Sequence, residues 1–318
     1  MSRVGARALK RLALGTGYYH RRLENDRFSG VVVLCYHGVR EAEATTLPFA
    51  PLHVTAGELE AHCRVVRDTC HPFSLSEWDA ARRGAASLPP RPVVFTFDDG
   101  YRSVLRIAQP ILERYEIPAT VFIANGAVET SQLFWHDAVA RQRGEAAVEA
   151  MKELPYETWR RTCDELAVTS REDEASPLSA MEISSLARCE GITIGGHTVS
   201  HAILSRAEPR QQLEEIRVNK AWLEDTTDGP VTAFAYPNGR PGIDYDETSV
   251  ACVAEAGYRW GFTTRQEIAM PNARFLECSR FMMLAGISEA ELAHRLSHSW
   301  RNIQGGPHLP NRRIEAHD

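Results

Sequence analysis

The 318-residue sequence lacks paired cysteines, a basic excess and any long apolar run, and each absence narrows its function. Its seven cysteines are scattered singly without a Cys-x-x-Cys pair, which disfavours a zinc–cysteine site and is typical of reduced thiols in a cytosol-like compartment. The formal net charge of -6 provides no overall electrostatic footprint for nucleic acid. No apolar stretch approaches the length of a membrane span. We therefore expect a cytoplasmic protein that binds no nucleic acid.

The N-terminus is basic, and residues 1–28 are predicted to be a separate segment. Basic and apolar residues alternate there at helical spacing, but the apolar stretch 12–14 is too short for a signal-peptide core. The first basic residues are Arg3, Arg7, Lys10 and Arg11. Such a helix either docks on the protein's own body or makes weak contact with an anionic membrane surface, which would make the protein peripheral to the membrane.

From Gly30 onward, short apolar and β-branched runs alternate with helical patterns. The predicted strands are 31–36, 93–97, 120–123, 191–194, 231–235 and 260–263, and helical patterns include 56–67, 107–115 and 209–223. Strands that are apolar at successive positions suit a parallel sheet covered on both faces. The alternation therefore predicts an α/β fold, either a βα barrel or an open doubly wound sheet.

Two stretches depart from this alternation. A long polar segment follows the third predicted strand, and we interpret it as a helical insertion at about 127–185 that caps one rim of the barrel. Beyond residue 300, turn-forming and charged residues show no periodicity, which predicts a disordered tail over 301–318. One catalytic domain is then expected over residues 29–300.

Two adjacent carboxylates, Asp98 and Asp99, end the second predicted strand and are followed by Gly100. In βα barrels the loops after the strands build the active site, so acids at this place favour a functional role. Neighbouring side chains point to opposite faces along a strand, but a bend at its end lets both carboxylates reach one cavity. The alternative is that one of them only caps the next helix.

Two histidines, His197 and His201, follow another predicted strand. At this spacing they would lie on one face of a helical turn and present both imidazoles to one ion, although the same spacing also arises by chance on protein surfaces. One carboxylate and two imidazoles make a three-ligand set that leaves positions open for water, as catalytic zinc sites require. The second carboxylate is then free to act as a base.

Three motifs of this sequence together match the pattern of a known family. Thr-Phe-Asp-Asp-Gly at 96–100, His-Thr-x-x-His at 197–201 and Phe-Ala-Tyr-Pro-Asn-Gly at 234–239 occur in the order seen in polysaccharide deacetylases of the NodB-homology, carbohydrate esterase 4 type. The chain resembles that family over roughly residues 30–285. The resemblance implies a distorted (β/α)7 barrel of the NodB-homology type, here with the helical insertion.

The resemblance also implies residue roles. It implies that Asp99, His197 and His201 hold one divalent ion, usually Zn2+, and that Asp98 is the catalytic base. The ion would lower the pKa of a water molecule, and Asp98 would accept the proton from that water. A backbone N–H in the turn 236–239 would add to an oxyanion hole, although proline at 237 has none to donate.

The chain departs from the family pattern in one motif. Many relatives begin the third motif with an arginine that orients the base, whereas this sequence has Phe234 there. Another cation must take that role, or none does. Arg280 is the candidate, and the alternative is that Arg280 forms only a surface salt bridge.

The catalytic acid has three candidates. The family's late Leu-x-His motif matches both His294 and His298, but these lie in a segment with helical periodicity and are interpreted as chance matches. A subset that resembles poly-N-acetylglucosamine deacetylases carries Tyr-His-x-Val on the first strand, and Tyr36-His37-Gly38-Val39 fits it. We expect His37 to protonate the leaving amine, with a core histidine bonded to a carbonyl as the alternative.

Together these features predict a hydrolase that removes an N-acyl group, in the simplest case N-acetyl, from an amino sugar in a polysaccharide or glycolipid precursor. One alternative is an amidase acting on an N-formyl sugar or a cyclic ureide. Another is a non-catalytic carbohydrate-binding relative that keeps the barrel. The carboxylate beside the metal set argues against the last, because a binding module needs no base.

Overall fold

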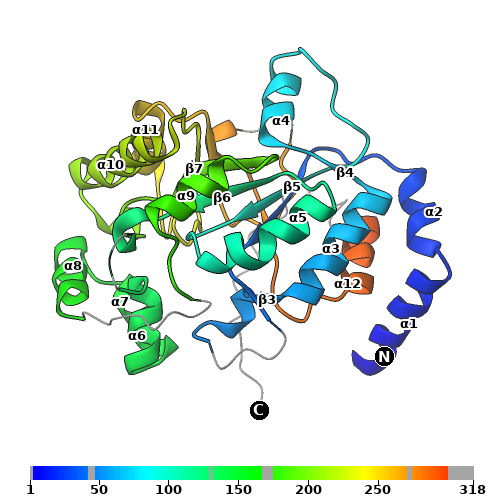
Figure 1. The fold of residues 1–318 in the computed structure, drawn as a ribbon, viewed down its shortest axis with the longest axis horizontal. Coiled ribbons are helices and arrows are strands. Elements are labelled where there is room, and N and C mark those ends of the chain that lie inside the picture. Colours follow the sequence, from blue (N-terminus) through cyan, green and yellow to red (C-terminus); the bar gives the residue numbers. More distant parts are fainter. Residues whose placement is uncertain are drawn as a thin grey trace.

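A computed structural model describes residues 3–41, 47–128, 130, 132–166, 175–270 and 274–299. Within these residues, a sheet of parallel strands forms the centre of the molecule (Figure 1). Its strands, in spatial order, are β10 (Phe281–Met282), β1 (Val32–Tyr36), β5 (Pro92–Phe97), β6 (Ala119–Ile123), β7 (Ile192–Gly196), β8 (Ala233–Ala235) and β9 (Trp260–Phe262). Six of these strands were predicted, and β10 was not.

The segment before β10 closes the sheet into a barrel. Cys278 pairs with Phe262 of β9, and Phe281 then pairs with Leu34 of β1. The last strand therefore lies beside the first, and each remaining strand lies beside its predecessor among these seven. This confirms the distorted (β/α)7 barrel and excludes the open doubly wound sheet.

Helices cover the outside of the sheet (Figure 1). Those that follow or flank its strands are α3 (Ala56–Thr69), α5 (Gln109–Arg114), α9 (Ala180–Ala187), α10 (Pro209–Thr227), α11 (Glu247–Glu255) and α12 (Glu289–His294). The helices predicted at 56–67, 107–115 and 209–223 correspond to α3, to a π-helical turn followed by α5, and to α10. Capping boxes start α3 at Thr55 and α9 at Ser179, where the side chains satisfy backbone N–H groups that have no partner within the helix.

The barrel interior is aromatic and is closed at one end. The strand β4 (His71–Pro72) pairs with the beginning of β5, and α4 (Leu75–Arg82) follows it. The ring of Trp78 on α4 lies 4.7 Å from that of Trp260 at the start of β9. Because α4 covers the amino ends of the strands, the carboxyl ends are left to form the site.

A second small sheet, β2 (Val39–Arg40) with β3 (Val54–Thr55), follows β1.

Three further helices lie in the polar stretch between β6 and β7. They are α6 (Trp135–Arg143), α7 (Glu145–Lys152) and α8 (Tyr156–Glu165), and they share a small apolar cluster that includes Val139, Val148 and Trp159.

Before the barrel come α1 (Arg3–Gly15) and α2 (Tyr18–Glu24). The tail predicted to be disordered lies outside the described residues. In the described part of the chain, no helix is both long enough and apolar enough to cross a membrane.

Candidate metal centre and active site

Asp98 and Asp99 leave the end of β5 through a sharp turn. The Asp98 N–H donates to the carbonyl of Tyr36 at 2.9 Å, which continues the pairing of β5 with β1. Asp99 and Gly100 then adopt positive φ angles of 73° and 93°. A non-glycine residue in this region is uncommon and marks a functional turn when the surroundings hold it. The expected bend is present, and both carboxylates are buried.

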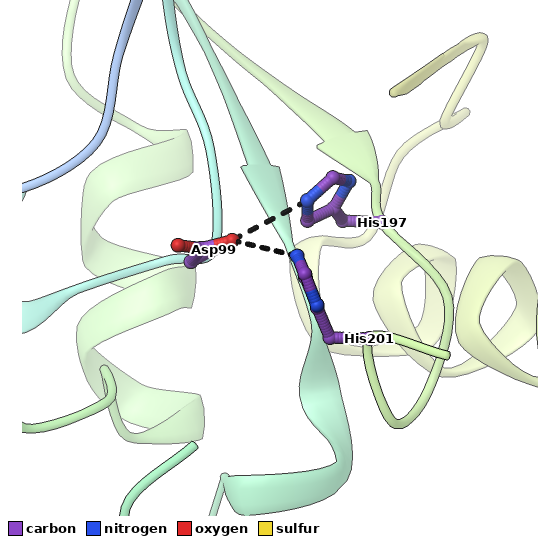
Figure 2. A group of neighbouring side chains, drawn as sticks. All are labelled: Asp99, His197 and His201. Carbon is purple, nitrogen blue, oxygen red and sulfur yellow. Dashed lines mark ion pairs between the residues drawn. The ribbon is translucent and has the colours of Figure 1, made fainter. Parts of the chain in front are cut away.

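One oxygen of Asp99 faces two imidazoles. Asp99 Oδ1 lies 3.3 Å from His197 Nε2 and 3.3 Å from His201 Nε2 (Figure 2). The three candidate ligand atoms all lie within 4.8 Å of one another, and all three residues are buried. The structure thus brings together the three residues that the sequence predicted as metal ligands.

The segment 197–201 is a loop, so the expectation of a helical turn there is wrong. Thr198 and His201 have φ angles of 64° and 56°, which no right-handed helix contains. The two left-handed residues reverse the chain and bring His197 and His201 together, with ring centroids 4.8 Å apart. The same pairing of imidazoles is reached by loop geometry instead of helical periodicity.

Two side chains of α10 hold this loop. The Glu215 carboxylate accepts the N–H groups of Val199 and Ser200, both at 2.9 Å, and the Ser200 hydroxyl at 2.6 Å. The Asn219 side-chain oxygen accepts the His197 N–H at 3.1 Å. Buried backbone donors in an irregular loop need such acceptors. Glu215 and Asn219, four positions apart on one helix, therefore fix where the two histidines stand.

The donor set fits a divalent cation. His197 Nδ1 lies 2.7 Å from the carbonyl oxygen of Ala235, which only accepts, so this nitrogen carries a proton and Nε2 is the ring atom that faces Asp99. Asp99 Oδ1 is buried and has no hydrogen-bond partner in the described part of the chain. A buried carboxylate oxygen that faces two imidazole nitrogens is a set of donor atoms that a divalent cation such as zinc can bind.

Asp98 is held by Arg280 and stands beside this set. Arg280 Nη1 donates to Asp98 Oδ1 at 2.6 Å and Nη2 donates to Asp98 Oδ2 at 2.8 Å, a bidentate pair. Arg280 is completely buried, so the alternative of a surface salt bridge is wrong. Burial opposes ionisation of Asp98, but the Arg280 guanidinium outweighs it and lowers the pKa of Asp98 below its usual value.

Arg280 occupies the barrel interior, just beneath the rim. Its Nε donates to the Thr263 carbonyl at 2.9 Å and Nη1 also donates to the Thr96 hydroxyl at 3.2 Å. The guanidinium lies over the rings of Phe122 and Phe262, at 5.6 and 5.9 Å from their centroids. The segment that closes the barrel thus places an arginine against Asp98, whereas the third motif has none.

His37 follows β1 at the same rim. Tyr36 and Phe97 are register partners, so His37 and Asp98 leave neighbouring strands at the same level. His37 Nδ1 is buried and has no hydrogen-bond partner among the described residues, and the residue lies close enough for its charge to lower the pKa of Asp98 and Asp99. The alternative was that His37 is a core histidine bonded to a carbonyl. Its Nδ1 makes no such bond to any described residue.

The rival histidines lie elsewhere. His294 ends α12 and His298 lies in the π-helical turn after it, so their setting is helical. Their partners are hydroxyls of α2: His294 Nδ1 lies 3.3 Å from Tyr19 Oη and His298 Nε2 lies 3.4 Å from Tyr18 Oη. Both rings therefore face the N-terminal helices, outside the barrel.

The sequence reasoning missed a second network at the site. The Tyr101 hydroxyl donates to Asp137 Oδ2 at 2.9 Å and lies 3.1 Å from His136 Nε2. His136 Nε2 lies 3.9 Å from Asp99 Oδ2, and its ring centroid lies 4.9 Å from that of His201. Helix α6 thus brings a His-Asp pair against the ligand set. The signal was a buried-type segment, Phe-Trp-His-Asp at 134–137, inside an otherwise polar stretch.

The chain belongs to the polysaccharide deacetylase family, whose sequence pattern matches residues 85–261. Membership makes it a hydrolase of carbon–nitrogen bonds other than peptide bonds. The chain is 22% identical over 268 residues to YxkH of Bacillus subtilis (strain 168), a protein named as a polysaccharide deacetylase, and the match covers 84% of this chain and 76% of YxkH. It is 25% identical to the poly-beta-1,6-N-acetyl-D-glucosamine N-deacetylase of Escherichia coli (strain K12), covering 62% of this chain but only 25% of that protein.

Solved structures show the same fold. The Streptococcus pyogenes deacetylase PplD, determined in complex with acetate, matches with a TM-score of 0.61 at 20% identity, over 84% of this chain and 98% of PplD. IcaB from Ammonifex degensii matches with a TM-score of 0.61 at 20% identity, over 85% of this chain and 98% of IcaB. At this identity the likeness concerns the fold alone.

Proposed function

We propose that this protein hydrolyses the N-acetyl group of a hexosamine in a polysaccharide or in a glycolipid precursor of one. One observation carries the proposal. Asp98 adjoins the Asp99, His197 and His201 set but is held by Arg280 instead of joining it. A site that only bound carbohydrate would have no use for a buried, oriented carboxylate beside a ligand set.

Asp99, His197 and His201 would hold one divalent ion, with Zn2+ favoured by two imidazoles and one carboxylate. Such an ion supplies Lewis acidity, which polarises the amide carbonyl and lowers the pKa of a water molecule. Asp98 accepts a proton from the attacking water. Arg280 keeps both Asp98 oxygens directed and the carboxylate ionised, so that it is ready to accept that proton.

His37 is the proposed acid. When the C–N bond of the tetrahedral intermediate breaks, the nitrogen needs a proton to leave as an amine, and an imidazole donates one near neutral pH. The position of His37 at the end of β1, beside Asp98 at the end of β5, supports this role. The water supplies the oxygen of the released acetate, and its two protons pass by way of Asp98 and His37 to the products.

The backbone donor of the proposed oxyanion hole can be assigned to one N–H group of the turn 236–239. The Tyr236 N–H already donates to the Phe262 carbonyl, the Gly239 N–H donates to the Pro237 carbonyl, and Pro237 has no N–H. The N–H of Asn238 is the one left without a partner among the described residues. We therefore assign the backbone contribution to Asn238, whose positive φ of 56° sets the direction of this N–H.

Tyr101, His136 and Asp137 are proposed as positioning residues. The Tyr101 hydroxyl gives its proton to Asp137, so its oxygen accepts from the N–H of His136. His136 of this buried trio lies near Asp99 Oδ2, whereas His197 and His201 face Asp99 Oδ1. A partner that fixes a ligand carboxylate raises metal affinity.

Release of acetate decides between the proposed substrates. The metal-loaded protein is incubated with N-acetylglucosamine oligomers, with the corresponding N-formyl sugars and with a cyclic ureide, and the released acetate, formate and ring-opened product are quantified. The Asp98→Asn variant serves as the control for contaminating activity. We expect acetate from the acetylated oligomers only. Formate release or ring opening in preference to acetate would instead establish the alternative amidase.

A further inference from the structure

Helix α1 presents an apolar stripe to solvent. Val4, Leu9 and Leu12 are 78%, 57% and 63% exposed, and Ala8 between them is also exposed. Positions 4, 8 and 12 follow one another along one face of a helix, and position 9 borders that face. Large apolar side chains gathered in this way on one helix mark an interaction surface, whereas single exposed ones need no explanation.

The opposite face of α1 already has its partner. Leu14 and Ala13 pack against the main core, and the Lys10 ammonium lies 2.6 Å from a carboxylate oxygen of Glu291 on α12. The following helix, α2, is anchored by the buried residues Tyr19 and Leu23. Figure 1 shows α1 at the edge of the molecule, beside α12. The face of α1 that packs on the rest of the protein is therefore already in contact with it. The exposed stripe lies on the other face of the helix.

The charged residues of α1 itself are all basic. Residues 1–23 contain six basic residues and no acidic one, in a protein whose formal net charge is -6. The six are Arg3, Arg7, Lys10, Arg11, Arg21 and Arg22. Arg7 and Arg11 are exposed, border the stripe and form no ion pair within the part of the chain that the structure describes.

We propose that α1 binds the surface of a lipid bilayer containing anionic phospholipids. The apolar stripe would enter the boundary between headgroups and acyl chains, and the flanking arginines would meet the phosphates. A second copy of the chain is the wrong occupant, because pairing two such faces would bring the unpaired arginines of both copies together. This inference is independent of the proposed hydrolysis and rests only on α1 and its flanking charges.

Vesicle flotation of the full chain tests the proposal. Binding is measured to vesicles of equal parts phosphatidylglycerol and phosphatidylcholine and to vesicles of phosphatidylcholine alone, at low and high salt. We expect binding to the anionic vesicles to be at least about tenfold tighter and to weaken with salt. Leu9→Gln with Leu12→Gln, and separately Arg7→Gln with Arg11→Gln, should each weaken it about tenfold or more.

A matched control separates this stripe from exposed apolar residues in general. Met181→Gln with Val218→Gln replaces two side chains that are 80% and 50% exposed on α9 and α10, and this variant should float like the parent. Circular dichroism checks that each variant keeps its fold. Three results overturn the proposal: no flotation of the parent, equal binding to both kinds of vesicle, or equal loss in the control variant. Light scattering that finds dimers dissociated by the Leu9 and Leu12 changes would also overturn it and make a second copy the occupant.

Discussion

Arg280 binds Asp98 through two hydrogen bonds of 2.6 and 2.8 Å, and the two residues are 182 positions apart in the chain. The pair is buried inside the barrel and joins its closing segment to the end of β5. A buried charge without a partner is costly, so each residue stabilises the position of the other. The geometry makes Arg280 the residue that orients the proposed base.

Replacing Arg280 by Lys should lower kcat more than it changes metal binding. Lysine keeps the positive charge but cannot make the bidentate contact or reach the Thr263 and Thr96 oxygens in the same fixed plane. We expect kcat to fall by about tenfold to a hundredfold with bound metal unchanged. The control is Arg64→Lys, which alters an exposed arginine fork to Glu289. Equal kcat in the Arg280 variant and the parent would remove its positioning role.

Asp98→Asn and His201→Ala should separate the base from the metal ligands. The first should retain bound zinc while the rate falls by about a hundredfold or more, and the second should lose zinc and activity together. Metal content is measured by mass spectrometry and turnover by acetate release. Full zinc occupancy in His201→Ala and in His197→Ala would refute the ligand assignment.

Asp98→Asn also leaves the Arg280 charge buried without a counter-ion, which costs on the order of 3–5 kcal/mol. A double variant, Asp98→Asn with Arg280→Met, removes both charges and should recover most of the lost thermal stability. It should remain inactive. Activity that returns together with stability would show that Asp98 acts only through folding.

His37→Ala should bind metal normally and lose most turnover on an unactivated amide. It should lose much less on a substrate with a good leaving group, because such a group departs without a proton from the enzyme. His294→Ala and His298→Ala are natural comparisons, since both side chains contact hydroxyls of α2. If either of these shows the leaving-group pattern and His37→Ala behaves like the parent, the acid is assigned wrongly.

The free energy of unfolding should fall as the pH falls from about 6.5 to about 4 because of His62. This buried imidazole lies 3.1 Å from the Tyr36 hydroxyl and 2.7 Å from the Ile287 carbonyl, and burial lowers its pKa from 6.5 to about 4. Below pH 6.5, His62 binds a proton in the unfolded chain but not in the folded chain. The contribution of neutral His62 to the free energy of unfolding is therefore fully present above pH 6.5 and is lost as the pH falls toward 4. The loss is on the order of 2–3 kcal/mol.

Urea denaturation at pH 7 and pH 4.5 measures the effect, with His62→Gln as the comparison. The glutamine has no proton to gain in this range, so the variant should lose less stability between the two pH values than the parent does. His20→Gln, at an exposed position on α2, is the control and should follow the parent. Identical pH dependence in the parent and in His62→Gln would contradict the role of burial.

The barrel and the candidate ligand set could be predicted because each strand and each motif leaves a signal within a short stretch of sequence. Continuous apolar runs mark buried parallel strands, and residues that follow such strands meet at one rim, which places Asp98, Asp99 and His197 together whatever the details of the loops. The loop 197–201 shows the limit of that reasoning. Its two histidines converge because acceptors from α10 hold an irregular backbone, and spacing alone does not reveal those acceptors.

The partner of the base and the network from α6 could not be predicted in the same way. The strand β10 has only two residues, and the apolar run 281–285 that follows Arg280 does not reveal that this arginine lies inside the barrel. Its burial follows from barrel closure, which is a property of the whole fold. Likewise, His136 lies in an insertion whose helices reach the rim only through tertiary packing. No spacing in the sequence indicates that His136 lies near Asp99.

Closure of the barrel by the segment 278–282 ties hydrolytic competence to the order of synthesis. In a nascent chain, Asp98 and the two candidate ligand histidines precede Arg280, so the two hydrogen bonds from Arg280 to the Asp98 carboxylate cannot form until that segment has been synthesised. Contacts of such large sequence separation form late in folding, because the loop entropy must be overcome first. We therefore expect the segment that orients the proposed base to dock late, so that chains ending before Arg280 should not hydrolyse the substrate.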